Sequence, residues 1–284
     1  MRSEAELKAL LAQMQDDACA PPSDTQELDV LVADLLAHIG STDAQLRDDL
    51  IYGMFIRLFI ETHLSEDQAR HIFNAAIGER HLLYKIGEVD TDSVFTRSFS
   101  ALIIPIAFEM NQKKAFLSTA DIMRAKDAAL RYLREENDLR GFVPGKGWAH
   151  SVAHCADALA YLAESPALAQ DDLAQILDAI KNAVQRPGLV YLYEEDERLT
   201  NAFMQAYERG LLPDAHIIEW LRALKSSGAQ DEQQPNAMFA QVNRKNFLRC
   251  IYFKLSRKGC APEIMECLKA LCEWEWPPGE GAPQ

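Results

Sequence analysis

Two histidines and an aspartate lie close together in the segment GWAHSVAHCADALAYL, which begins at Gly147. In a helix, His150, His154 and Asp157 would follow one face, because they are four and seven residues apart. Two imidazoles and a carboxylate form a known ligand set for zinc or non-haem iron, so one hypothesis is a bound divalent metal such as zinc. The segment lacks the glutamate of HExxH, which would supply a general base. The alternative needs no cofactor: these side chains hydrogen-bond neighbouring loops or a polar ligand.

The helical periodicity of this segment separates an apolar side from a polar side. We expect the helix to begin at Trp148, with an apolar stripe that packs on neighbouring helices: Trp148, Val152, Cys155, Leu159 and Leu162. The opposite stripe is polar and is flanked by alanines: His150, His154, Asp157 and Tyr161. Small residues beside polar groups allow a ligand to approach closely, so we expect this stripe to line a concave surface.

The four residues before this helix, Pro144-Gly145-Lys146-Gly147, resemble a phosphate-binding loop. Glycines expose backbone N–H groups at a helix start, and Lys146 adds a positive charge. The P-loop spacing GxxxxGK followed by Ser or Thr is absent, so nucleotide hydrolysis is not expected. The alternative interpretation is a glycine-rich turn between two helices that carries an exposed lysine.

A polar loop, an acidic residue and an arginine at the head of an apolar helix recur along the chain. The arginines are Arg47, Arg97, Arg198 and, in a looser match, Arg244. Capping and holding the adjacent unit is the architectural interpretation of these acid–arginine pairs. Arg47 and Arg244 project among apolar residues, whereas Arg97 and Arg198 point away from them, so we predict that only Arg97 and Arg198 reach the concave surface.

The acidic run that follows Tyr193 contributes two further candidates. Glu195 and Asp196 usually belong to a solvated helix start, but here they could supply a carboxylate to the same surface. No nucleophile is expected: Cys155 follows His154 directly, and adjacent helical residues diverge by about 100°.

Apolar residues recur at three- and four-residue steps through nearly the whole chain, which predicts an all-α fold. Ser23-Asp24, Ser65 and Ser118 are placed to cap helix starts. Only Leu189 to Tyr193 carries a weak strand pattern.

The recurring arginine units predict the domain organisation. Their spacing indicates about five helix pairs of roughly 50 residues each, an α-solenoid of the HEAT or armadillo type in one curved domain over residues 1–276. The stretch 226–235 is expected to be an inter-helix loop and 277–284 a frayed tail.

Composition narrows the class of partner. The chain has 284 residues and a net charge of −14, which repels phosphate backbones and anionic lipids, so we expect no nucleic acid and no membrane partner. A helical-repeat protein that handles DNA would need a basic stripe on its concave face. No secretory signal is recognised, and the longest unbroken apolar stretch, Ala101 to Phe108, is far shorter than the roughly 20 residues that cross a bilayer.

The segment RGFVPGKGWAHSVAH, together with HIGSTDAQLRDDLIY, DSVFTRSFSALI and YEEDERL, resembles a bacterial family, domain-of-unknown-function family 2785. The resemblance spans about Leu28 to Phe253. It implies a cytoplasmic, all-helical, HEAT-like protein, and it implies no activity, substrate or cofactor.

We therefore expect a cytoplasmic helical-repeat protein that holds a peptide, a protein segment or a small polar ligand in a concave groove. The alternative is a metal-dependent hydrolase with His150, His154 and Asp157 as ligands and Glu195 or Asp196 as base. The predicted ligand-binding residues are Arg97, Lys146, Trp148, His150, His154, Asp157, Tyr161, Glu195 and Arg198.

Overall fold

A computed structural model describes residues 1–16, 20–61, 63–226 and 235–272 of the chain. Helices make up nearly all of its regular structure, which confirms the all-α prediction. The first half contains α1 (Glu4–Asp16), α2 (Thr25–Ala37), the π-helix η1 (Gln45–Tyr52), α3 (Gly53–Ile60), α4 (Glu66–Ala76), α5 (Ser93–Ala101), α6 (Ile103–Lys113) and α7 (Thr119–Glu135). The second half contains α8 (Ser151–Glu164), α9 (Gln170–Val184), α10 (Glu195–Glu208), α11 (Asp214–Ser226), α12 (Pro235–Lys258) and α13 (Pro262–Cys272).

Local sequence signals define several helix starts. Ser65 and Ser118 each form a capping box with the residue three positions later, and Asp24 accepts hydrogen bonds from two backbone N–H groups of α2. These caps satisfy donors that a helix leaves free at its first turn, which explains why the chain turns into a helix there. The three predicted starts are confirmed.

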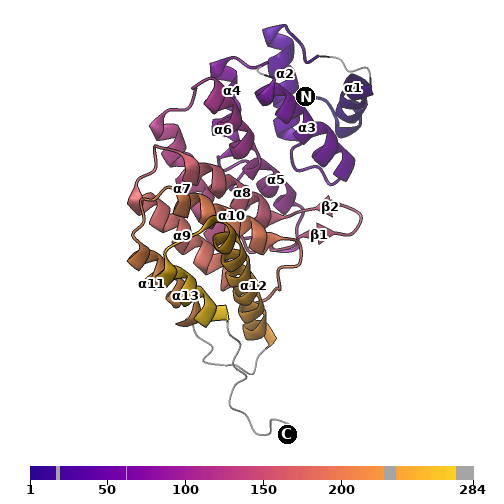
Figure 1. Cartoon of the computed structure of the whole chain (residues 1–284). Helices are drawn as coiled ribbons and strands as arrows, with labels where there is room; N and C mark the ends of the chain where they lie inside the picture. Colours follow the sequence, from indigo (N-terminus) through magenta and orange to yellow (C-terminus); the bar gives the residue numbers. More distant parts are fainter. Residues whose placement is uncertain (17–19, 62, 227–234, 273–284) are drawn as a thin grey trace.

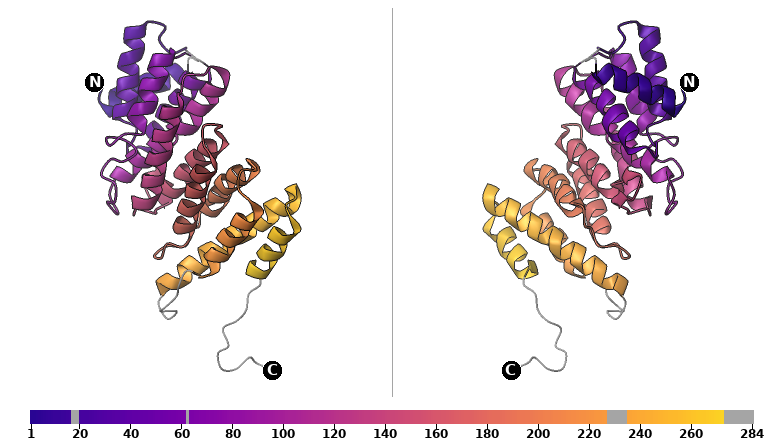
Figure 2. Two further views of the ribbon diagram at one scale, coloured as in Figure 1. Left: turned by 90° about the vertical axis from the view of Figure 1, so that its left-hand side faces the viewer. Right: turned by 90° about the vertical axis from the view of Figure 1, so that its right-hand side faces the viewer.

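The helices follow one another along the molecule in chain order, from α1 at one end to α13 at the other (Figures 1 and 2). Hydrogen bonds tie each region to the one about 50 residues further on. Arg124 donates to Asn74, Arg131 to Glu79 and Tyr161 to Glu109, at separations of 50, 52 and 52 residues. The predicted period of the chain therefore reappears as a period of side-chain contacts.

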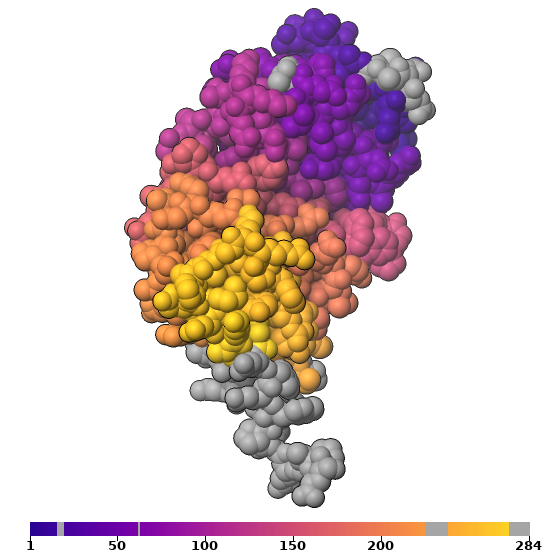
Figure 3. All heavy atoms as spheres, in the orientation of Figure 1, coloured from indigo at the N-terminus to yellow at the C-terminus, as the bar shows by residue number. Residues whose placement is uncertain are grey.

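A small β-hairpin interrupts the helices between α7 and α8. β1 (Phe142–Val143) pairs antiparallel with β2 (Gly147–Trp148), and the hairpin projects from the helical body (Figures 1 and 3). The expected helix start at Trp148 is therefore wrong: α8 begins at Ser151. The physical reason is that the N–H groups of Ala149 and His150 both donate to the Gly141 carbonyl, which holds the chain in the hairpin.

The structure also bears on the predicted strand, loop and tail. The run 189–193 forms no strand. The expected loop at 226–235 and the expected tail at 277–284 fall almost entirely outside the described residues, which end at 226, resume at 235 and stop at 272.

Among the described residues, one segment is long and apolar enough to cross a membrane by length and composition. It covers α5 and α6, Ser93–Lys113, and 89% of its most apolar window is buried inside the protein. A buried core helix passes the same test. The expectation of no membrane partner therefore stays a prediction.

Candidate functional site

His150 immediately precedes α8 in a left-handed backbone conformation, with φ 49° and ψ 37°. This conformation costs a residue other than glycine roughly 1 kcal/mol or more, so surrounding contacts must maintain it. The imidazole stacks on the Trp148 indole, with ring centres 4.3 Å apart and planes 22° apart. Its Nε2 atom is buried and has no hydrogen-bond partner.

His154 lies one helical turn further along α8 and is only 8% exposed. Its ring is nearly perpendicular to the rings of Phe99 and His150. The distances between ring centres are 5.1 Å to Phe99 and 5.6 Å to His150. Its Nδ1 atom is buried without a hydrogen-bond partner. A buried polar atom left unpaired typically costs about 1–3 kcal/mol, so this atom needs an explanation.

The described residues contain four buried side-chain nitrogen or oxygen atoms without a hydrogen-bond partner, and they lie in one neighbourhood. Besides the two imidazole atoms, they are Nε of Arg47 and Oδ1 of Asp48. These two form an ion pair at 2.8 Å whose angles are not those of a hydrogen bond. The Arg47 guanidinium lies 4.7 Å from the centre of the Phe99 ring, which in turn contacts His154. We call His150, His154 and Phe99 the histidine site.

Arg47 holds the hairpin against this site. The π-helix η1 places it in the core, where it donates to the carbonyls of Ser41, Lys146 and Trp148 at 2.6, 2.8 and 3.2 Å. Close packing at Gly147 completes the attachment, because an added Cβ would lie 2.8 Å from the Ala44 side chain. Arg47 thus positions Trp148, although it lies 101 residues earlier in the chain.

A charged pair borders the histidine site. Arg198 of α10 donates to the Asp157 carboxylate of α8. Burial raises the pKa of Asp157 to about 6, even though Arg198 acts to lower it. Tyr52 of η1 lies close to this pair: burial, followed by the Asp157 charge, raises the pKa of its hydroxyl to about 12. Similarly, burial raises the pKa of Asp48 to about 6 against the opposing effect of Arg47.

Both imidazoles are neutral at pH 7. Burial, followed by the nearby His150 and Arg198, lowers the pKa of His154 to about 3. Burial and then Arg198 lower the pKa of His150. A backbone hydrogen bond at Ser98 acts to raise the pKa of His154, and one at Tyr193 acts to raise the pKa of His150. This is the effect of a carbonyl that accepts a hydrogen bond from the ring.

These backbone contacts assign the tautomers. Because Nδ1 of His154 and Nε2 of His150 have no partner, the opposite nitrogen of each ring makes the backbone contact and carries the proton. A neutral imidazole has one donor and one acceptor nitrogen. The unpartnered atoms therefore carry the lone pairs and act as acceptors.

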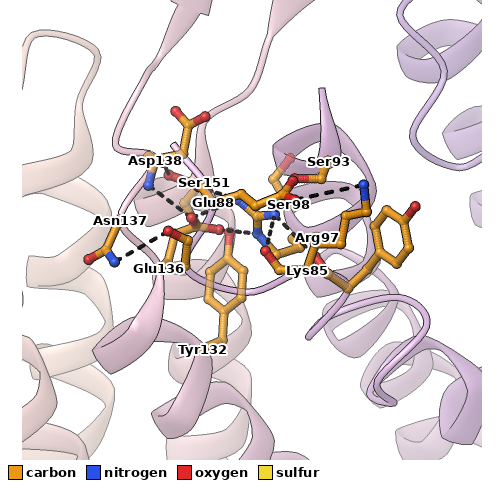
Figure 4. A network of polar contacts seen from close by, with 12 residues as sticks. Lys85, Glu88, Ser93, Arg97, Ser98, Tyr132, Glu136, Asn137, Asp138 and Ser151 are labelled. Carbon is orange, nitrogen blue, oxygen red and sulfur yellow. Dashed lines mark hydrogen bonds and ion pairs between the residues drawn. The ribbon is translucent and has the colours of Figure 1, made fainter. Parts of the chain in front are cut away.

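The structure removes some predicted residues from this site. Arg97 is fully buried and makes a two-pronged ion pair with Glu136, at 2.5 and 2.8 Å (Figure 4). Its remaining donors reach Ser93 and backbone carbonyls of the 84–88 loop. The prediction that Arg97 lines a concave surface is wrong, because its charge is consumed inside the core.

The glycine segment at 144–147 is the turn of the hairpin. Lys146 donates to both carboxylate oxygens of Asp92, at 2.6 and 2.8 Å. α8 begins only at Ser151, so the glycines do not form a helix start, and the structure agrees with the turn interpretation rather than the phosphate-binding one. Trp148 is 37% exposed on β2, so its predicted place in the buried apolar stripe is also wrong.

The remaining predicted residues divide between the site and its surroundings. Tyr161 donates to Glu109 at 2.7 Å, further along α8. Glu195 is almost fully buried and accepts the backbone N–H of Tyr193 at 2.8 Å, so it shapes the loop that carries Tyr193. Burial raises the pKa values of both Glu195 and Asp196.

The proposed metal ligands are not assembled as a set. Among residues 1–16, 20–61, 63–226 and 235–272, no group of three or more His, Cys, Asp or Glu side chains is arranged to hold a metal ion. Asp157 is directed at Arg198, which leaves His150 and His154 as a pair.

Comparison with known proteins assigns the chain to a family. A family model described as "Protein of unknown function (DUF2785)" matches residues 82–253. The chain belongs to this family. The DUF2785 match includes the hairpin, both histidines, Asp157 and Arg198, whereas Arg47 and Asp48 precede it. No curated protein and no solved structure matches the chain.

Sequence reasoning missed several residues of this DUF2785 site: Arg47 as its anchor, and Asp48, Tyr52, Phe99 and Tyr193. One signal was available. His154 is the fourth residue after the residue that caps α8, as Arg198 is in α10, so His154 occupies in α8 the position that Arg198 has in α10.

Proposed function

We propose that this DUF2785 protein is a helical-repeat binding protein, an α-solenoid of stacked helix pairs that holds a peptide, a protein segment or a small polar ligand at the histidine site. The contacts at about 50-residue spacing support the stacking, because each unit of a solenoid touches only its neighbours. α8 contacts α5, α6, α7, α9 and α10, which supports a histidine site between consecutive units.

The observation that carries the proposal is the unpartnered Nδ1 of His154. The ring is 8% exposed and carries a lone pair that the fold leaves unused, next to a second unused lone pair on His150. Buried polar groups are otherwise paired in native proteins. A fold keeps such a group when a ligand completes it, and the left-handed backbone of His150 is a second local cost of the same kind.

The substitution His154→Leu tests this proposal through stability. Replacing this buried imidazole with an apolar side chain of similar size removes the desolvation penalty of the unpaired Nδ1 and also the backbone contact at Ser98, so we expect the free energy of unfolding to change by less than about 1 kcal/mol. His81→Leu is the matched control. The His81 ring makes backbone contacts at both Leu36 and Ala75, so this variant relieves no unpaired atom and is expected to lose more stability.

Urea unfolding followed by circular dichroism measures both variants, and an NMR screen of small polar compounds measures ligand binding to the same proteins. We expect bound compounds to shift the His150 and His154 ring signals in the wild type and to lose affinity in His154→Leu. A clear loss of stability in His154→Leu, together with no compound that shifts either ring, would contradict the proposal.

A metal-dependent hydrolase is the second candidate, and one observation favours it: two acceptor nitrogens lie on successive turns of α8. Its third ligand, Asp157, is engaged by Arg198. Elemental analysis of the purified protein distinguishes the candidates. Stoichiometric zinc, iron or manganese that disappears in His154→Ala would favour the hydrolase.

A further inference from the structure

Three aromatic side chains lie together on the outside of the hairpin. Phe142, Trp148 and Tyr193 are 44%, 37% and 38% exposed. The Trp148 ring lies 5.0 Å from Phe142 and 5.2 Å from Tyr193, at angles of 74° and 77°. We call these three residues the aromatic surface. Clustered exposed aromatic rings are typical of binding surfaces, where they supply large contact area at low entropic cost.

The backbone and the packing hold the aromatic surface in place. The Tyr193 ring lies directly against Gly141, where an added Cβ would come within 2.0 Å of its Cδ2 atom. His150 stacks on one side of the Trp148 indole and joins the aromatic surface to the unpartnered lone pairs behind it. The aromatic surface and the histidine site are therefore contiguous.

The charges around the aromatic surface favour a cationic ligand. Each neighbouring cation already has a carboxylate: Lys146 has Asp92, and Arg198 has Asp157. Glu194 follows Tyr193 directly, is exposed, and makes no ion pair with any residue that the structure describes. Its charge reaches His150. The whole chain carries −14, so both the local and the overall charge complement a positive partner.

The hydrogen-bonding groups also favour a cationic ligand. Ammonium and guanidinium groups only donate, and they bind well over the faces of Trp and Tyr rings. The two free imidazole atoms accept. An anionic ligand would meet lone pairs and carboxylates without a free donor, since the nearby arginines are already paired.

We infer that Phe142, Trp148 and Tyr193, with Glu194 and the two imidazoles, bind a lysine or arginine side chain of a peptide segment in a partner protein. This inference rests on the proposed function, and it specifies the ligand that the histidine site takes.

The test uses three peptides of equal length with the full-length protein. Ac-GRGRGRG-NH2 is the cationic probe, the same peptide with citrulline in place of arginine is its neutral match, and Ac-GEGEGEG-NH2 is the anionic probe. Shifts of the Trp148 indole N–H signal in 1H–15N spectra give the dissociation constant of each. We expect the arginine peptide to bind at least about tenfold more tightly than the citrulline peptide, because cation–π attraction is lost.

Two variants locate the binding. Trp148→Ala is expected to weaken the arginine peptide by about tenfold, measured by calorimetry. Phe253→Ala is the control, because Phe253 is an exposed aromatic residue on α12. Melting curves show whether each variant is folded, and Glu194→Gln, on an exposed side chain, provides a second reading: roughly threefold weaker binding.

The outcomes separate the two levels of the proposal. Equal binding of the arginine and citrulline peptides, or tighter binding of the glutamate peptide, would overturn the cationic ligand. Neither outcome decides the proposed function, which concerns ligand binding at the histidine site in general. That function fails separately, on the stability and screening results for His154→Leu.

Discussion

At the scale of single residues, His154 and Arg198 occupy the same position in α8 and α10 but make different contacts. Each is the fourth residue after the cap of its helix. Arg198 reaches the carboxylate of Asp157, whereas His154 reaches no polar side chain through its Nδ1. The same position therefore carries an ion pair in α10 and an unsatisfied acceptor in α8.

This burial makes His154 a source of acid sensitivity. Its folded pKa of about 3 lies below its ordinary value of 6.5. The folded protein thus binds fewer protons than the unfolded chain between these values, and the stability that the neutral ring contributes is lost as the pH falls from about 6.5 toward 3. We expect the stability of the wild type relative to His154→Leu to decrease steadily from pH 7 to pH 4, measured by urea unfolding at each pH. A difference that is constant with pH would show that folding leaves the pKa of His154 at its ordinary value.

Residue types alone could predict the two histidines, Asp157 and Arg198, because helical spacing is a local property. They could not predict the conformation of His150 or the exposure of Trp148. Both depend on the Gly141 carbonyl and on Arg47, whose bond to Trp148 spans 101 residues of sequence. A helix that began at Trp148 would place this side chain in the apolar stripe, but the hairpin places it at the surface.

At the scale of elements, the hairpin replaces the first turn of the expected helix and carries the aromatic surface. Two of its glycines have similar backbone angles but different surroundings: φ is 77° at Gly145 and 80° at Gly147. An added Cβ meets nothing within 4 Å at Gly145, but lies 2.8 Å from Ala44 and 3.1 Å from Arg47 at Gly147. The two positions therefore separate backbone strain from packing.

Alanine substitution at each position provides this comparison. Gly145→Ala is expected to cost about 1 kcal/mol from the left-handed backbone alone. Gly147→Ala should cost roughly 2–3 kcal/mol and change the Trp148 indole signal, because η1 must move away from the hairpin. Thermal unfolding and 1H–15N spectra measure both. Equal effects of the two substitutions would mean that η1 does not anchor the hairpin.

At the scale of the whole molecule, the fold class and the period of about 50 residues were predictable. Both depend on patterns of residues that lie close together in the sequence, such as capping signals and apolar spacing. Ser65 and Ser118 illustrate this, since each needs only the residue three positions later. The contacts between segments about 50 residues apart, such as that of Arg131 with Glu79, join distant parts of the sequence and carry no local signal.

The proposed stacking of units predicts that damage stays local. α13 contacts α11 and α12 at the C-terminal end of the molecule, whereas the hairpin of β1 and β2 lies at mid-length (Figure 1). We expect removal of residues 259–284 to lower the melting temperature while the Trp148 indole N–H signal keeps its position, because a solenoid transmits contacts only between neighbours. Loss of that signal on truncation would instead indicate one cooperative bundle.

The ion pair of Arg97 with Glu136 also matters before folding is complete. Arg97 lies within the apolar segment Ser93–Lys113, and Glu136 follows it by 39 residues. During synthesis the guanidinium therefore emerges without its partner. An arginine opposes the entry of a helix into lipid by roughly 2.5–3.5 kcal/mol at the helix centre and by less near an end, where Arg97 lies as the fifth of the 21 residues of this segment. Until α7 is complete, this charge therefore discourages the nascent segment from partitioning into a bilayer.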